Sequence, residues 1–503
     1  EFDPKTGLLT FTTAHFSTYQ VITEPQIWKL LYNPPGASAY TGAATYQYPI
    51  DLPPGIGGLT PDLSLNYSSR PAEGMRKPAM GSGFGVGWSL PQAQINNGNT
   101  GKMYDFNGGA SDFQNYNFTL VLNGVTYYLK KLETYDNRSH GSYQAVGGPD
   151  LRIEYLDDGY QGKPENDTGN VTGEFWRVRT ADGTTYTFGF TEGAEQVIWP
   201  VNTLPFRNGN QPRNKSFSAY NWKLDSVTDV HGNKIEYVYD TACGVEWVGG
   251  GNRQGNLEGG GGKECTEVDT AVKEIHYNFN GATAQTKILF TNEQMNFNQR
   301  RQEKSMTAGV FRPTEIKVMQ GGTTTITRYA FIYSTAAHYH SPWDISTEYW
   351  TLTSLSRTGA GGAGALPAQT FGYNRETGTC QDGACVKLLT HVNNGYGAVT
   401  VMNYTNIIGT RWNYVSKVET WDGVAAKYGT DPQPQSRRMY VPGVVPDSDP
   451  NTSMFCYDKP WHATDNPCNS RVVPGEGSEA LIGFDAMTIE TWAPSDSSWM
   501  AKE

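Results

Sequence analysis

The sequence has few charged residues and no excess of basic ones. Asp, Glu, Lys and Arg make up 18% of the 503 residues, against about 25% in typical globular proteins, and the formal net charge is −11. Binding to nucleic acid requires clustered Lys and Arg that neutralise phosphates, so this balance argues against a nucleic-acid partner and also against docking on anionic lipid, and we expect neither. No apolar run approaches about 18 residues, so we expect no membrane span.

The chain also starts at Glu1 without a methionine, and no signal peptide is visible. We therefore expect it to be a processed or internal piece of a longer protein.

Signatures of catalysis are missing as well. The sequence contains no GxSxG elbow, no HExxH zinc motif, no CxxC redox pair and no GxxxxGK[ST] phosphate loop. The eight histidines are scattered, with His338 and His340 as their only cluster. One weak calcium candidate places oxygen ligands at alternate positions, but Pro450 interrupts it and Thr452 stands where a calcium loop needs glycine. Its residues are Asp447, Asp449 and Asn451. We expect no catalytic residues, no cofactor and no metal beyond that candidate, and hence not an enzyme.

The six cysteines fall into three couples that are close in sequence. An even count in near-neighbour couples suggests disulfides and an oxidising compartment, outside the cell or on its surface. We choose the local pairing only because it closes short loops; free thiols and a metal site remain alternatives. The pairs are Cys243–Cys265, Cys380–Cys385 and Cys456–Cys468.

Alternation of apolar and polar residues dominates the chain, whereas long amphipathic helical patterns are nearly absent. Asp182-Gly183 and Asn123-Gly124 each lie between two alternating runs, which is a strong signal for a β-hairpin. Further turns are expected at 231–233, 320–322 and 394–395. Evenly spaced short strands joined by such turns predict an all-β fold of antiparallel hairpins.

The stretch GSGFGVGWSL, residues 81–90, could be taken for a phosphate-binding loop. No lysine follows it, and Pro91 rules out the helix that a dinucleotide fingerprint would open. The glycines instead alternate with bulky residues, which predicts a strand with one apolar face and one face of bare backbone that another layer approaches closely. The residues of this structural motif are Gly81, Gly83, Phe84, Gly85, Gly87 and Trp88.

Composition shifts divide the chain into four parts. Residues 1–24 are expected to be the C-terminal hairpin of a preceding β-sandwich, and 25–247 a module of β-strands. A Gly-rich loop follows over 248–264, and β-strands continue over 265–503 with a Pro/Asp-rich loop near 441–475.

Several of these stretches together resemble a known family. Residues 54–69 followed by 81–90 are similar to the N-terminal module of the Salmonella virulence-plasmid B proteins, which also begins the B subunits of insecticidal toxin complexes. Residues 224–240 resemble one YD repeat of the Rhs type, and 388–404 resemble the strand-turn-strand that follows in those B subunits. The resemblance implies that residues 25–247 and 265–503 are β-shell modules. In such a shell, of the hollow Rhs/YD type, a long antiparallel ribbon of hairpins spirals around and encloses a polypeptide.

What this resemblance implies is a structural function. We expect a secreted or cell-surface β-shell segment that encloses or presents a C-terminal polypeptide. Its expected partners are the downstream Rhs/YD-repeat part of the same or a partner chain, and other toxin-complex or cell-surface subunits. An adhesion or filament scaffold built on the same shell is the alternative, and a carbohydrate-binding or glycoside-active protein is a third. The autoproteolytic and ADP-ribosyltransferase motifs of such proteins do not occur in this chain, so those activities are not carried over.

Overall fold

The computed structural model divides the chain into two compact units, Glu1–Asn33 and Pro34–Glu503. The structure describes residues 2–3, 8–9, 34–38, 41–73, 83–97, 118–135, 140–157, 169–170, 172–198, 218–248, 263–294, 311–340, 346–360, 364–375, 387–406, 413–421, 436–442, 487–493 and 498–502. In the first unit, β1 (Phe2–Asp3) pairs antiparallel with β2 (Leu8–Leu9). Its expected origin in a β-sandwich stays a prediction.

The second unit contains a closed ring of eight antiparallel strands. Each strand pairs with the next, β13 pairs with β15, and β15 pairs with β7 to close the circuit. The strands are β7 (Gln94–Asn97), β8 (Phe118–Leu122), β9 (Val125–Thr134), β10 (Gly141–Ala145), β11 (Arg152–Asp157), β12 (Glu174–Arg179), β13 (Thr185–Phe188) and β15 (Ser218–Thr228). We call these eight strands the ring.

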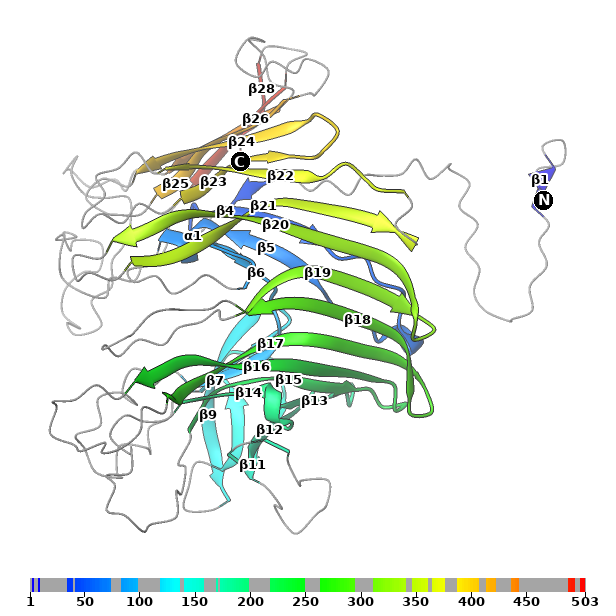
Figure 1. The fold of residues 1–503 in the computed structure, drawn as a ribbon. Coiled ribbons are helices and arrows are strands. Elements are labelled where there is room, and N and C mark those ends of the chain that lie inside the picture. Colours follow the sequence, from blue (N-terminus) through cyan, green and yellow to red (C-terminus); the bar gives the residue numbers. More distant parts are fainter. Residues whose placement is uncertain are drawn as a thin grey trace, which may run out of the picture. The chain divides into compact units, whose positions relative to one another are not determined.

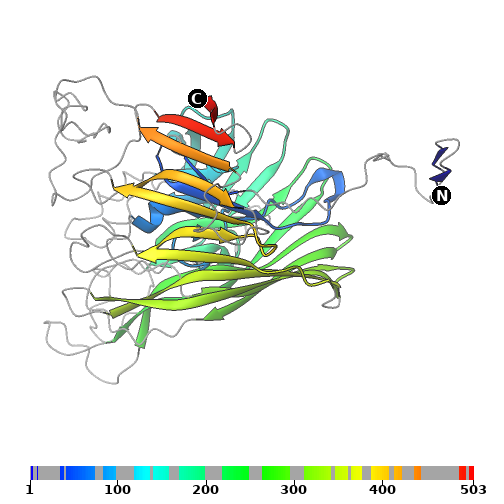
Figure 2. The same cartoon turned by 90° about the horizontal axis from the view of Figure 1, so that it is seen from above.

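Strand β15 also begins a second feature, a long antiparallel ribbon in which every strand pairs with the next one in the chain. Figure 1 shows its strands lying side by side in chain order, coloured from green to red, and Figure 2 shows the same order from above. The ribbon strands are β16 (Lys234–Val248), β17 (Lys263–Asn280), β18 (Thr283–Gln294), β19 (Phe311–Gln320), β20 (Thr324–His340), β21 (Ser346–Gly359), β22 (Gln369–Arg375), β23 (Lys387–Asn393), β24 (Val399–Asn406), β25 (Asn413–Trp421), β26 (Ser436–Pro442), β27 (Met487–Ala493) and β28 (Ser498–Lys502). Strand β14 (Glu195–Ile198) pairs with both β15 and β17, where ring and ribbon meet.

A third feature is a smaller sheet formed by residues 36–89, which we call the strap. Its strands β3 (Gly36–Ala37), β4 (Ala44–Pro49), β5 (Ser64–Ser68) and β6 (Trp88–Ser89) pair in this order. The strap also contains the 3-10 turn η1 (Ile56–Gly58) and the short helix α1 (Ser69–Glu73). The all-β, antiparallel fold predicted from the alternation of residues is therefore confirmed.

The predicted hairpins lie where the turn residues place them. Asn123 and Gly124, with φ of 51° and 76°, join β8 to β9, and this left-handed pair matches the twist of the strands it connects. Asp182-Gly183 lies in the longer turn that joins β12 to β13, where only Gly183, with φ of 85°, is left-handed. The remaining predicted turns also fall between paired strands, at 231–233, 320–322 and 394–395.

Aromatic side chains fill the interior of the ring. Trp176 lies flat against Tyr155, with ring centroids 4.3 Å apart and an interplanar angle of 11°. Phe118 packs edge-on against Trp176 at 4.8 Å and against Trp222 at 5.8 Å. These four side chains come from β8, β11, β12 and β15, so the cluster holds opposite sides of the ring together. Across the described part of the chain, no helix is long and apolar enough to cross a membrane.

Candidate functional site

The interface between the strap and the ribbon is the best-defined candidate site. Apolar residues alternate along the strap strands, and their buried face packs on ribbon residues far away in the sequence. Tyr46 and Trp88 lie 5.9 Å apart between ring centroids, and Phe371 of β22 packs 4.8 Å from Trp88. The edge-to-face geometry of these pairs adds stabilisation beyond the buried area.

The glycine-rich stretch forms the tightest part of this interface. Only Trp88–Ser89 is strand, so the prediction of a strand over 81–90 is wrong for residues 83–87, which form turns. The reason is the backbone of Gly85 and Gly87, whose φ values of 99° and 78° do not belong to a strand. Gly81 lies outside the described residues.

The ribbon backbone does approach this stretch closely, as predicted. A Cβ on Gly83 would lie 2.6 Å from the carbonyl oxygen of Phe311, and one on Gly85 would lie 2.9 Å from that of Trp350. Phe84, 5% exposed, packs edge-on against Phe331 at 5.3 Å between centroids. The glycines therefore leave room for the ribbon backbone, and the apolar side chain of Phe84 between them packs against the ribbon.

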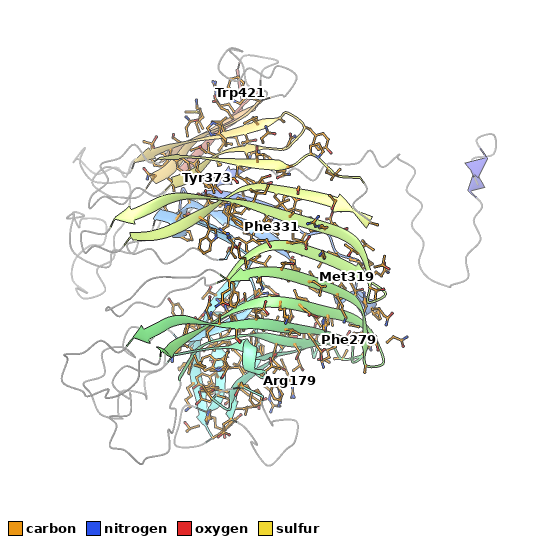
Figure 3. All side chains as sticks on the ribbon, viewed as in Figure 1. Arg179, Phe279, Met319, Phe331, Tyr373 and Trp421 are labelled. Atoms are coloured by element: carbon orange, nitrogen blue, oxygen red, sulfur yellow. The ribbon has the colours of Figure 1, made fainter. Side chains whose placement is uncertain are left out.

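Hydrogen bonds fix the same contact. The Val86 amide donates to the Trp350 carbonyl oxygen at 3.1 Å, and Trp350 Nε1 donates to the Gly83 carbonyl oxygen at 3.1 Å. Trp88 Nε1 donates to the Tyr373 hydroxyl at 2.7 Å. Figure 3 shows Phe331 and Tyr373 on the ribbon strands that receive the strap. Every polar group named here has a partner, as a buried interface requires.

The strap contacts several ribbon strands along its length. At one end, Tyr277 of β17 donates its hydroxyl to the Pro53 carbonyl oxygen at 2.9 Å. In the middle, Arg357 of β21 forms an ion pair with Asp51, with Nη1 and Oδ2 2.6 Å apart. At the other end, Arg70 Nη1 donates to the Asn413 carbonyl oxygen of β25 at 3.2 Å. One short segment thus contacts strands from β17 to β25.

Two buried tyrosines make this contact sensitive to alkaline pH. Burial raises the pKa of Tyr277 to about 12, and it also raises the pKa of Tyr329 to about 12. The Tyr329 hydroxyl accepts a hydrogen bond from the Asp51 amide at 2.9 Å. Both hydroxyls contact the strap, and burial favours their neutral form. At Tyr329 the guanidinium of Arg357, 5.7 Å from the ring centroid, opposes the rise in pKa to a smaller extent.

We predict that the strap loosens between pH 10 and pH 12. Because the pKa in the folded state exceeds the ordinary value of 10.0, the stabilisation is complete below pH 10 and is lost as the pH rises through about 12. Unfolding by denaturant at stepped pH, followed with tyrosinate absorbance, measures this loss. The double variant Tyr277→Phe and Tyr329→Phe should show a shallower fall over that range; an unchanged slope would contradict the assignment.

The side chains of the predicted disulfides and of the calcium candidate lie outside the described residues. Cys243 and Cys265 lie on the paired strands β16 and β17, opposite Val268 and Glu246, but their side chains lie outside the described residues. The remaining four cysteines and the calcium candidate also lie outside them: Cys380, Cys385, Cys456, Cys468, Asp447, Asp449 and Asn451. The disulfides and the calcium site therefore stay predictions. Within the described residues, no group of three or more His, Cys, Asp or Glu could hold a metal ion.

The ribbon half of the interface could not be predicted from the sequence. Tyr277, Tyr329 and Arg357 lie in ordinary strand patterns, and no local motif marks them. Their partners lie more than 200 residues earlier in the chain, as with the 224-residue separation of Tyr277 and Pro53.

The glycine-rich stretch and the strap that carries it lie within a region that matches a known family. A family model described as Salmonella virulence plasmid 65kDa B protein (SpvB) matches residues 38–300, more than half of the chain. The chain belongs to this family. The resemblance stated from residues 54–90 is thereby confirmed. A comparison with curated protein sequences finds no match.

Solved structures of toxin complexes and of an SpvB domain are similar to this chain. The crystal structure of TcdB2-TccC3-TEV has 14% identity and a TM-score of 0.45, over 86% of this chain and 22% of that chain. The Photorhabdus luminescens Tc holotoxin pore has 15% identity and a TM-score of 0.38, over 97% of this chain and 22% of that one. The N-terminal domain of the effector SpvB from Salmonella typhimurium strain LT2 has 14% identity and a TM-score of 0.28, over 74% and 98%. The chain thus spans about a fifth of the toxin-complex chains that it matches.

Proposed function

We propose that this chain is a structural wall segment of a toxin-complex-like shell. It works by enclosing or presenting a polypeptide, not by catalysis. The observation that carries the proposal is the ribbon, in which strands β15 to β28 pair in chain order while the strap spans β17 to β25. A sheet that grows strand by strand suits a wall, because each added hairpin extends the surface without altering the strands already present.

Membership of the virulence plasmid B protein family supports this proposal. Under it, the partners are the downstream repeat region of the same or an associated chain, and other toxin-complex subunits. The site of action is then outside the producing cell or on its surface.

The test uses the full-length protein that contains this chain. The native protein is exposed to a protease, and the fragments are identified by mass spectrometry. We expect a polypeptide C-terminal to the wall to survive digestion in the native protein and to be cut rapidly after the strap contact is broken by Trp88→Ala.

A matched control is Tyr128→Ala, because this tyrosine is 69% exposed and its loss should leave the shell closed. If the C-terminal polypeptide is cut rapidly in the native protein as well as in both variants, the proposal that the shell encloses it is wrong. Repeating contacts between molecules in electron micrographs would then favour the adhesion or filament scaffold.

A further inference from the structure

A polar cluster lies on the strand pairing that closes the ring. In the register of β7 and β15, Gln94 stands directly opposite Lys223. The neighbouring Trp222 packs with Trp176 and the other aromatic residues of the ring, so Lys223 lies on the opposite face of β15. Lys223 Nζ is 3.0 Å from Gln94 Oε1. An amine and a carboxamide are therefore held in contact across the closing pair.

A second donor holds the same carbonyl. Asn221 Nδ2 donates to Gln94 Oε1 at 3.1 Å, and Asn221 is only 7% exposed. A fixed N–H donor aimed at a carbonyl oxygen stabilises the negative charge that develops there when a nucleophile attacks the carbon. The Gln94 carboxamide is thus both positioned and polarised.

A buried carboxylate completes the cluster. Asp269 of β17 is 5% exposed and accepts a hydrogen bond from Gln196 Nε2 at 2.6 Å. Burial lowers the pKa of Lys223, and the nearby charge of Asp269 opposes this shift to a smaller extent. The neutral, nucleophilic form of the amine is thereby favoured.

Three other described lysines have a different environment. Lys234, Lys317 and Lys417 each pair directly with a glutamate on their own strand, at distances of 2.5, 2.8 and 3.2 Å between Nζ and a carboxylate oxygen. Lys223 has a carboxamide where these lysines have a carboxylate.

We propose that Lys223 and Gln94 form an intramolecular isopeptide bond that covalently closes the ring. Nζ of the neutral amine attacks Cδ of Gln94, and Asn221 Nδ2 stabilises the tetrahedral oxyanion on Oε1. Asp269 takes a proton from Nζ and returns it to Nε2 of Gln94. The Cδ–Nε2 bond then breaks, ammonia leaves, and a secondary amide joins the two side chains. Neither an oxidant nor a co-reactant is required.

The position of this bond has a mechanical consequence. The β7–β15 pairing is the step that closes the circuit of eight strands. A covalent bond there would tie residue 94 to residue 223 and prevent the ring from opening between its first and last strands. Cross-links of long loops restrict the unfolded chain and thereby stabilise the fold.

The test is the mass of the purified protein that contains this chain, measured after denaturation, together with its proteolytic peptides. We expect a loss of about 17 Da, the mass of ammonia released when the lysine acylates, and one branched peptide joining the segments that carry Gln94 and Lys223. The variants Lys223→Met and Gln94→Met should each have the full mass of their sequences, and Asp269→Asn should acquire the bond more slowly.

The wild-type measurement alone is decisive, because it does not depend on the folding of a variant. Lys234→Met is the matched control, and it should retain the mass loss. The proposal is overturned if the wild-type protein has its full sequence mass, or if the loss maps to a single unbranched peptide, as ring closure of an Asn-Gly pair would give. A loss that persists in Lys223→Met would overturn it equally.

Discussion

Replacing Gly85 by alanine is expected to detach the 83–87 turn from the ribbon and to lower the free energy of unfolding by about 3 kcal/mol or more. Two effects combine at this position. The φ of 99° is strained for any residue with a side chain, and the new Cβ would lie 2.9 Å from the Trp350 carbonyl oxygen and 3.2 Å from the Leu352 amide nitrogen. Both contacts are backbone atoms of a paired ribbon strand, so neither can move aside easily.

The matched control separates the two effects. Gly58 also has a positive φ, of 84°, but a Cβ added there would have nothing within 4 Å. Gly58→Ala should therefore cost only the backbone strain, about 1 kcal/mol. Denaturant unfolding of the two variants, followed by tryptophan fluorescence, measures the difference. If the two substitutions cost the same, the close approach of the ribbon at Gly85 contributes nothing.

Local chemistry explains why the hairpins could be predicted. Asn123-Gly124 specifies a left-handed turn by itself, and the alternating residues on either side specify which face is buried. The same reasoning fails over 83–87, because alternating glycines fit equally well in a strand and in a series of tight turns. What decides between them is Trp350, which lies 267 residues after Gly83 in the sequence. Its indole Nε1 donates a hydrogen bond to the Gly83 carbonyl oxygen, and its own carbonyl oxygen accepts one from the Val86 amide.

Closure of the ring could not be predicted for the same reason. Its deciding contact joins Gln94 to Asn221, 127 residues apart, and both residues look unremarkable in their own strands. The sequence therefore specifies strands, turns and buried faces, whereas the pairing of distant strands depends on shape and polarity that appear only in the folded chain. The cluster of Lys223, Gln94 and Asp269 becomes visible only at that level.

The ring should depend strongly on its aromatic interior, and Trp176→Ala is expected to lower the free energy of unfolding by about 5 kcal/mol. Trp176 is fully buried, stacks on Tyr155 at 4.3 Å and contacts Phe118 at 4.8 Å and Trp222 at 5.9 Å. Alanine would leave a cavity that side chains from three other strands surround, β8, β11 and β15. Because those strands are tied into a closed circuit, they cannot collapse into it.

The control for this prediction is the exposed Tyr128 of β9. Its replacement by alanine removes a large aromatic side chain from the same ring, but one that is 69% exposed, and it should change the free energy of unfolding by about 0.5 kcal/mol or less. Near-ultraviolet circular dichroism reports the packed aromatic cluster, and its thermal loss should occur at a much lower temperature in Trp176→Ala than in Tyr128→Ala. Equal midpoints would mean that the cluster does not hold the ring together, and that strand pairing alone maintains it.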